Sequence, residues 1–290
     1  ALAASGTGGN RFRESWIGLL PVPFPRDYVI GIDLQKRDFE TGVASYLRGQ
    51  YSDHGWWYYY LYALAIKMPL GTLCLVLLAV WASFFQKGYN ARWREEAVAL
   101  VPFLTIMVLV SSQTGFSEPA RYVHPALPFL FVWTAKIGRA FALRRRVVTA
   151  LVTVLLVWTI GSAMWVFPHC LSYFNELVGG PRNGAWHLGV SNIDWGQDLF
   201  YFKDWYEHHP EARPIRIAYW GHYPLDVAGV KSDGPPPVGP QSVLVDDEEP
   251  KDRLGPRPGW YALSTSEIYG ESRQYSYFLE FQPVAMTGYS

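Results

Sequence analysis

The feature that most constrains this chain is a long apolar block, Trp57–Phe167, and no Asp occurs between Asp53 and Asp194. A run such as Leu70–Phe85 is too apolar and too unbroken for a surface helix of a soluble domain. The mean hydropathy of the whole chain, +0.01, hides this block because polar segments flank it. We therefore expect the chain to be embedded in a membrane.

Four segments of the block are each close to the roughly 20 residues that a helix needs to cross about 30 Å of hydrocarbon. They are predicted at Tyr59–Phe85, Ala97–Ser111, Tyr122–Ala142 and Val147–Phe167. Helix is predicted for each because a backbone inside lipid must satisfy its own hydrogen bonds. Pro69 divides the first segment, so we expect an interfacial segment at Trp56–Ile66 and then a crossing helix with Pro69 in its first turn.

The interfacial segment is rich in aromatic residues, which gather where a membrane meets water. They are Trp56, Trp57, Tyr58, Tyr59, Tyr60 and Tyr62. The pattern favours simple anchoring at the level of the lipid headgroups. Stacking against a sugar is the alternative role, and Tyr60 or Tyr62 is the candidate to line a lipid or sugar path.

Basic residues gather in two of the connections between the predicted spans. The first connection holds Lys87, Arg92 and Arg94, and the last holds Arg139 and Arg144–Arg146. Because cytoplasmic loops carry an excess of Lys and Arg, both connections are assigned to the cytoplasm. The connection Ser112–Arg121 and both ends of the chain, residues 1–58 and 168–290, are then predicted to be extracytoplasmic.

The last part of the chain, residues 168–290, changes to Gly, Pro, Asp and Tyr and predicts a small α/β domain. Asp194 and Gln197 have the spacing of a capping box, and an apolar stripe follows at Trp195, Leu199, Phe202 and Tyr206 before Pro210 ends the helix. Strands are predicted at Ile215–Trp220, Trp260–Ser264 and Val284–Tyr289. The acidic run Asp246–Glu249 is interpreted as a solvated loop.

Composition and motifs set several function classes aside. Lys and Arg number 25, and so do Asp and Glu, so no basic excess points to nucleic acid. No P-loop, GxSxG, HExxH or zinc-ribbon spacing occurs, and no cofactor is predicted. The pairs His208–His209 and His169–Cys170 lack the spacing of metal ligands, so no metal site is predicted either.

Polar residues at the outer boundary of the predicted spans are the candidates for function. Charges at helix ends reach the interface at little cost, so Lys67 has two open roles, snorkelling and phosphate binding. Arg121 and His124 open the third predicted span. The planar fork of an Arg suits a phosphate group, which makes Arg121 the better candidate for that ligand.

Two motifs resemble those of bacterial family 39 glycosyltransferases, the relatives of protein O-mannosyltransferases and aminoarabinose transferases. Arg121-Tyr-Val-His124-Pro-Ala-Leu-Pro128 is similar to the start of a late membrane helix in that family. The more specific match is Tyr173-Phe-Asn-Glu-Leu-Val-Gly-Gly-Pro181 followed by Ser191-Asn-Ile-Asp-Trp-Gly-Gln-Asp198, which resembles the segment after the last crossing. Val190 departs from the family pattern, in which an Asp is expected before Ser-Asn.

The resemblance implies a C-type glycosyltransferase of the bacterial inner membrane, which moves a sugar from a polyprenyl-phosphate donor to an acceptor on the outer face. The chain matches only the later half of such enzymes, whose catalytic carboxylate lies in an early outward loop, so no catalytic residue is assigned. Lys67, Arg121 and His124 are the implied phosphate ligands. For Asn192–Asp198, a structural clasp between the domain and the helices is favoured over an acceptor contact.

Two other classes of protein remain to be weighed. A non-catalytic membrane protein whose outward domain binds a glycan or a protein partner is the main alternative. The residues preceding Ala1 would discriminate, because further spans and an acidic outward loop would favour the enzyme. A transporter lacks support, because no charged residue with an obvious partner is predicted in the middle of a span.

Overall fold

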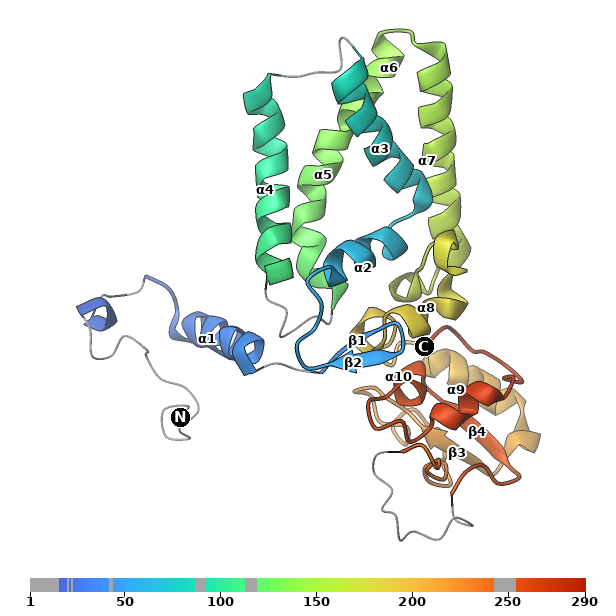
Figure 1. Cartoon of the computed structure of the whole chain (residues 1–290). Coiled ribbons are helices and arrows are strands. Elements are labelled where there is room, and N and C mark those ends of the chain that lie inside the picture. The colour runs from blue at the N-terminus through green and yellow to red at the C-terminus, as the bar shows by residue number, and fades with distance from the viewer. Residues whose placement is uncertain are drawn as a thin grey trace.

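The computed structural model describes residues 16–19, 21, 23–41, 44–86, 92–112, 119–242 and 254–290. Figure 1 shows a bundle of helices, a small α/β domain beyond one end of it, and helix α1 set apart from both. The acidic run Asp246–Glu249 lies outside the described residues.

The elements of the first part are mostly helices. They are η2 (Trp16–Leu19), α1 (Arg26–Thr41), β1 (Ser45–Leu47), β2 (Gln50–Ser52), α2 (Tyr59–Lys67), α3 (Leu70–Phe85), α4 (Trp93–Ser112), η4 (Ala120–Ala126), α5 (Leu127–Thr134), η5 (Ala135–Gly138), α6 (Arg139–Ala142) and α7 (Arg146–Val166). Strands β1 and β2 form an antiparallel hairpin. The main elements of the domain are α8 (Pro181–His187), α9 (Leu199–His208), β3 (Ile215–Ala218), β4 (Trp260–Leu263), α10 (Thr265–Ile268) and η11 (Ser276–Glu280).

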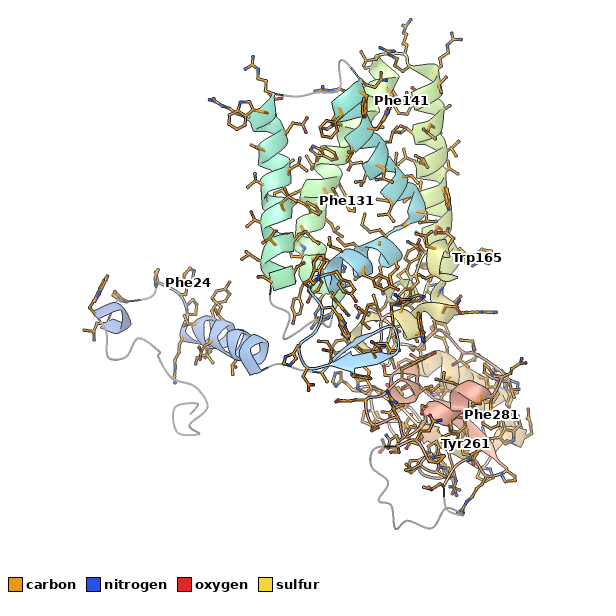
Figure 2. All side chains as sticks on the ribbon, in the orientation of Figure 1. Phe24, Phe131, Phe141, Trp165, Tyr261 and Phe281 are labelled. Atoms are coloured by element: carbon orange, nitrogen blue, oxygen red, sulfur yellow. The ribbon has the colours of Figure 1, made fainter. Side chains whose placement is uncertain are left out.

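Two described helices, α4 and α7, are long and apolar enough to cross a membrane, and the bent pair α2 and α3 makes a third span if it is counted as one. This is consistent with membrane association, but the prediction of about four spans is not confirmed. Only 6% of the apolar window of α4 and 11% of that of α7 are buried in the structure. Their apolar side chains point outward, as Trp165 does in Figure 2, and form the kind of surface that lipid covers.

The third predicted span, Tyr122–Ala142, is not one α-helix. It is built from η4, α5, η5 and α6, none of which reaches the length of a span. Pro125 lies inside η4 and Pro128 begins α5, and each lacks the amide that would donate to an earlier carbonyl. The series nevertheless packs against α4 and α3 and forms the centre of the bundle.

Small residues and one ion pair hold the bundle together. Gly71 of α3 lies so close to α7 that a β-carbon there would come within 2.3 Å of the Leu155 carbonyl oxygen. The ammonium of Lys136 contacts both carboxylate oxygens of Glu96, at 2.7 and 2.5 Å, and the hydroxyl of Ser83 at 3.0 Å. This partly buried pair joins η5, α4 and α3 near one end of the bundle.

The break predicted at Pro69 is confirmed, and a separate helix, α2, precedes it. Helix α2 is bent by 113° from α3, and Pro69 occupies the N-cap position of α3, one residue before the predicted first turn. The predicted aromatic belt is wrong at two of its positions. Trp57 is 66% exposed, whereas Tyr59 and Tyr60 are 1% exposed and pack in the core beneath α2, so these two rings do not anchor at a membrane surface.

The bend frees backbone groups at the end of α2, and Asn175 bonds to them. In a continuous helix the carbonyl of Ala65 would accept from residue 69, which is a proline without an amide. The Asn175 amide instead donates to the carbonyls of Ala65 at 2.7 Å and Met68 at 2.8 Å. Its backbone N–H donates to the carbonyl of Ile66 at 2.8 Å. A residue far along the chain thus completes α2.

The α/β domain has a two-stranded parallel sheet, β3 beside β4, with α9 packed against it. The predicted strands at Ile215–Trp220 and Trp260–Ser264 are confirmed with shorter bounds, and α9 ends at His208 before Pro210. The strand predicted at Val284–Tyr289 is wrong, because this segment is irregular. The hairpin β1–β2 packs on the domain, where the Arg48 amide donates to the His187 carbonyl at 3.1 Å.

The capping box predicted at Asp194 and Gln197 is also wrong. Helix α9 begins at Leu199, and Asp194 and Trp195 lie before it. The Asp194 carboxylate accepts from the Gly196 amide at 2.8 Å in a local turn. Gly196 has φ +75° and packs on the Tyr219 hydroxyl, so the chain turns here and cannot continue as a helix toward Asp194.

Asn175→Ala is expected to lower the free energy of unfolding by about 2–4 kcal/mol, because each buried carbonyl that loses its donor costs about 1–3 kcal/mol. Thermal unfolding of the chain in detergent micelles measures the change. Asn183→Ala on the exposed face of α8 is the matched control and should change stability by less than about 0.5 kcal/mol. Equal effects of the two variants would contradict this account of the bend.

Candidate functional site

A pocket of about 520 Å³ lies where the helical bundle meets the α/β domain. Its walls come from the break between α2 and α3, from η4, from α7, and from the segments at residues 170–173 and 191–195. The lining residues are Lys67, Pro69, Pro119, Ala120, Arg121, His124, Ala163, Cys170, Leu171, Tyr173, Ser191, Asn192 and Trp195. Lys67, Arg121 and His124, the three residues predicted as phosphate ligands, therefore lie together.

The ammonium of Lys67 is held in place by main-chain carbonyls. It donates to the carbonyl of Leu171 at 2.8 Å and to that of Asn192, and it lies 4.4 Å from the centre of the Phe174 ring. Two of its three N–H groups are used in this way, and the third remains for a ligand in the pocket. Lys67 thus ties α2 to the domain and also presents a basic group to the pocket.

Arg121 is exposed on η4 at the rim of the pocket. Its guanidinium lies over the ring of Trp195 at 5.4 Å and near that of Tyr122 at 5.9 Å. Within the described part of the chain, no carboxylate forms an ion pair with Arg121. Such an Arg keeps its donors free for an anion, while the aromatic face holds its plane in one orientation.

The electrostatic character of the pocket follows from its lining. None of its described lining residues is acidic, whereas Arg121 is cationic and Lys67 and His124 are basic. His124 lies on the same side as Arg121, one turn along η4. The Ser191 hydroxyl is buried in the pocket wall and forms no hydrogen bond with any described residue. The arrangement can hold an anion through charge and through donated hydrogen bonds.

Asn192 lines the pocket and joins the walls that come from the domain and from the helical bundle. Its side chain accepts from the Ala120 amide at 2.8 Å and donates to the Tyr59 hydroxyl at 2.9 Å. Both bonds are buried, and they join the domain to η4 and α2. Asn192, the first residue of the predicted segment Asn192–Asp198, therefore acts as the structural clasp that we expected from the sequence.

Tyr60 is the predicted site residue that the structure does not bring to the pocket. It is buried in the core of α2, edge-on to Tyr59, at a centroid distance of 5.2 Å. Helical periodicity alone does not say which face of α2 meets the bundle. Trp195 was missed in turn, because it was assigned to the stripe of α9. Trp195 lies next to Arg121 because the chain turns at Gly196.

Buried polar groups continue behind the pocket around Asp194. Asp194 is 1% exposed, and its Oδ2 forms no hydrogen bond with the described residues. Burial raises the pKa of this carboxyl, the Gly196 amide opposes the shift, and the nearby Asp198 adds to it. Burial also raises the pKa of Glu267, which faces the same region. Among the described residues, no group of three His, Cys, Asp or Glu side chains could hold a metal ion.

The fold and site define a bundle of apolar helices with a cationic pocket at its junction with an α/β domain. Comparison with protein-family models, with curated proteins and with solved structures finds no match for this chain. The function is therefore argued from the residues of the pocket.

Asp194→Asn is expected to stabilise the protein at pH 7 and to flatten its pH dependence. A raised pKa in the folded state means that the stabilising contribution of Asp194 is complete below its ordinary pKa, near 3.9, and is lost as the pH rises through the folded value. The amide removes this loss and raises the thermal midpoint at pH 7 by about 2–4 °C. Melting curves from pH 4 to pH 8 measure it.

The matched control is Asp204→Asn. The side chain of Asp204 is 77% exposed, so this substitution is expected to change stability little. The stability of both variants is still expected to depend on pH, because burial also raises the pKa of Glu267. A native pH profile in Asp194→Asn would show that Asp194 is not the group responsible.

Proposed function

We propose that this chain is part of a membrane glycosyltransferase and binds the phosphate of a polyprenyl-phosphate sugar donor. The observation that carries the proposal is the convergence of Lys67, Arg121 and His124 on one pocket whose described lining has no acidic residue. The pocket lies at the end of the apolar helices, the depth at which a lipid phosphate is found. The resemblance to family 39 glycosyltransferases supports the choice of donor.

The chemistry of the transfer explains why such a pocket is useful. The acceptor oxygen forms a bond to the anomeric carbon, the bond from that carbon to the phosphate oxygen breaks, and the lipid phosphate leaves with the electron pair. Cations around the departing phosphate stabilise the charge that develops on it. The acceptor proton goes to a base, which the family resemblance assigns to a carboxylate in an earlier outward loop and not to a residue of this pocket.

The orientation of the protein is part of the proposal. The end of α3, the beginning of α4 and the connection from α6 to α7 lie at the end of the bundle opposite the α/β domain (Figure 1). The basic residues Arg92, Arg94, Arg139 and Arg144–Arg146 belong to this end. With these residues in the cytoplasm of a bacterial cell, the pocket, the domain and both ends of the chain face outward from the inner membrane.

Arg121→Ala is expected to weaken binding of decaprenyl phosphate by about tenfold to a hundredfold, the loss of one hydrogen bond to a charged group. The chain is held in an amine-oxide detergent, which carries neither phosphate nor sugar, and binding is measured by titration calorimetry. Decaprenol, which has the same lipid tail without the phosphate, should bind native protein and variant equally.

The control variant is Arg145→Ala, which removes an exposed Arg from the opposite end of the bundle and should leave binding unchanged. Equal affinity of native protein for decaprenyl phosphate and decaprenol would reject phosphate recognition. Binding without sugar transfer by the complete protein would favour the alternative, a non-catalytic membrane protein whose outward domain binds a glycan or a protein partner.

A further inference from the structure

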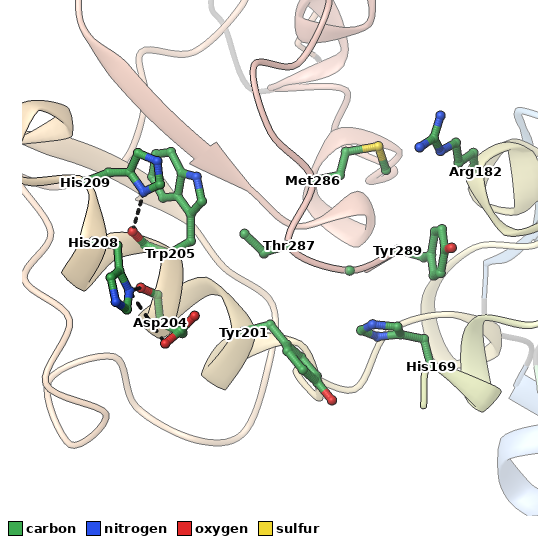
Figure 3. A pocket seen from close by; sticks show the side chains of 11 residues that line it. His169, Arg182, Tyr201, Asp204, Trp205, His208, His209, Met286, Thr287 and Tyr289 are labelled. Carbon is green, nitrogen blue, oxygen red and sulfur yellow. Dashed lines mark hydrogen bonds and ion pairs between the residues drawn. The ribbon is translucent and has the colours of Figure 1, made fainter. Parts of the chain in front are cut away.

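A second pocket, of about 620 Å³, lies in the α/β domain (Figure 3). It is bordered by α8, by one face of α9, by His169 and by the irregular segment at residues 286–289. Its lining combines cationic, imidazole and aromatic side chains with one carboxylate. The residues used below are His169, Arg182, Tyr201, Asp204 and Tyr289.

His169 is fixed in one orientation by Asp198. Its Nδ1 lies 2.8 Å from Asp198 Oδ1. The other oxygen, Oδ2, accepts from the amides of Tyr289 and Ser290, at 3.0 Å each, and from the Ser290 hydroxyl at 2.8 Å. Because a carboxylate only accepts, Nδ1 donates to Asp198, and in the tautomer with its proton on Nδ1 the other ring nitrogen, Nε2, is an acceptor. Nε2 has no partner among the described residues, so it can accept from a ligand hydroxyl.

Two tyrosine rings flank this imidazole. The centre of the Tyr201 ring lies 4.8 Å from that of His169, and the Tyr289 ring is edge-on to it at 5.4 Å. Figure 3 shows all three side chains together on one side of the pocket. Tyr201 is 45% exposed, so part of its ring is open to solvent. An exposed aromatic face beside hydrogen-bonding groups suits the C–H face and the hydroxyls of a sugar.

Arg182 gives the pocket a charged end. It projects from α8 and forms no ion pair with any described carboxylate. Asp204 is the carboxylate of the lining, and its Oδ1 lies 3.6 Å from the Nδ1 of His208. In Figure 3 this pair lies on the opposite side of the pocket from Arg182. An anion is therefore favoured at the Arg182 end, next to the sugar-binding face.

We propose that this second pocket binds a saccharide that bears an anionic group, either a phosphate or a carboxylate. Arg182 binds the anion, the open face of Tyr201 contacts the ring, and Nε2 of His169 accepts from a hydroxyl. The role of this saccharide rests on the glycosyl transfer proposed above. In that reaction the saccharide is the acceptor. His169 lines this pocket and the next residue, Cys170, lines the first one, so the two pockets are neighbours.

Calorimetric titration of the chain in the same amine-oxide detergent tests the proposal with four probes: glucose 6-phosphate, glucuronate, glucose and inorganic phosphate. At least one anionic sugar is expected to bind about tenfold more tightly than both glucose and phosphate. A gain for glucose 6-phosphate alone identifies a phosphate-bearing ligand, and a gain for glucuronate alone identifies a carboxylate. Native protein that binds neither anionic sugar better than glucose overturns the proposal.

Three variants locate the site. Arg182→Ala should remove the tenfold advantage of the anionic sugar and leave glucose unchanged, and Tyr201→Ala should weaken both about fivefold to tenfold. Arg257→Ala, which removes another exposed Arg of the domain, is the matched control and should change neither. Full anionic-sugar affinity in Arg182→Ala would overturn the proposal.

The two functions can fail separately. Arg121→Ala should keep its affinity for the anionic sugar, because Arg121 lines only the first pocket. Arg182→Ala should keep its affinity for decaprenyl phosphate. Native protein that prefers the anionic sugar but binds decaprenyl phosphate and decaprenol equally would reject the donor site alone, and native protein with the opposite preferences would reject the second pocket alone.

Discussion

The carbonyl oxygens at the end of α2 need hydrogen-bond donors, and much of the structure follows from how they obtain them. Pro69 cannot donate, and the 113° turn into α3 interrupts the helical ladder. An unsatisfied carbonyl in apolar surroundings costs more than a typical hydrogen bond contributes, so some other segment must bind there. Asn175 does so with its side-chain amide and its own backbone. The segment after α7 is thereby fixed against the bend, and it forms a wall of the first pocket.

Lys67 illustrates how a structural bond and a binding site share one residue. Its ammonium satisfies two carbonyls, those of Leu171 and Asn192, with neutral partners only. A carboxylate partner would have neutralised the charge, as Glu96 does for Lys136 at the other end of the bundle. Because main-chain carbonyls and not a carboxylate hold Lys67, this basic group has no counter-ion among its partners, and an anion bound in the pocket would supply one. The same reasoning applies to Arg121, which is oriented by the ring of Trp195.

Sequence patterns predicted those features that depend on local chemistry. Apolar length predicted α4 and α7, the proline at position 69 predicted the bend, and the position of charges at span ends brought Lys67, Arg121 and His124 to one boundary. Other features depend on tertiary contacts that periodicity does not contain. Tyr60 faces the core because α2 packs against η4 and α4, and Asp194 lies outside α9 because the chain turns at Gly196. The partnership of Lys136 with Glu96 joins residues of two different helices, which no single segment reveals.

The segments that carry the family resemblance are the ones that join the domain to the helices. Asn175 and Asn192 make buried bonds to α2 and η4, and Asp198 holds His169 and the chain at residues 289–290. The bond from His169 to Asp198 also holds the strip His169–Cys170, whose first residue lines the second pocket and whose second residue lines the first pocket. Successive α-carbons are only about 3.8 Å apart, and transfer requires the reacting atoms to approach to about 3–3.5 Å. If donor and acceptor occupy the two pockets, the sugar must cross at this strip, and a clasp that holds the strip rigid also determines how closely the two ligands can meet.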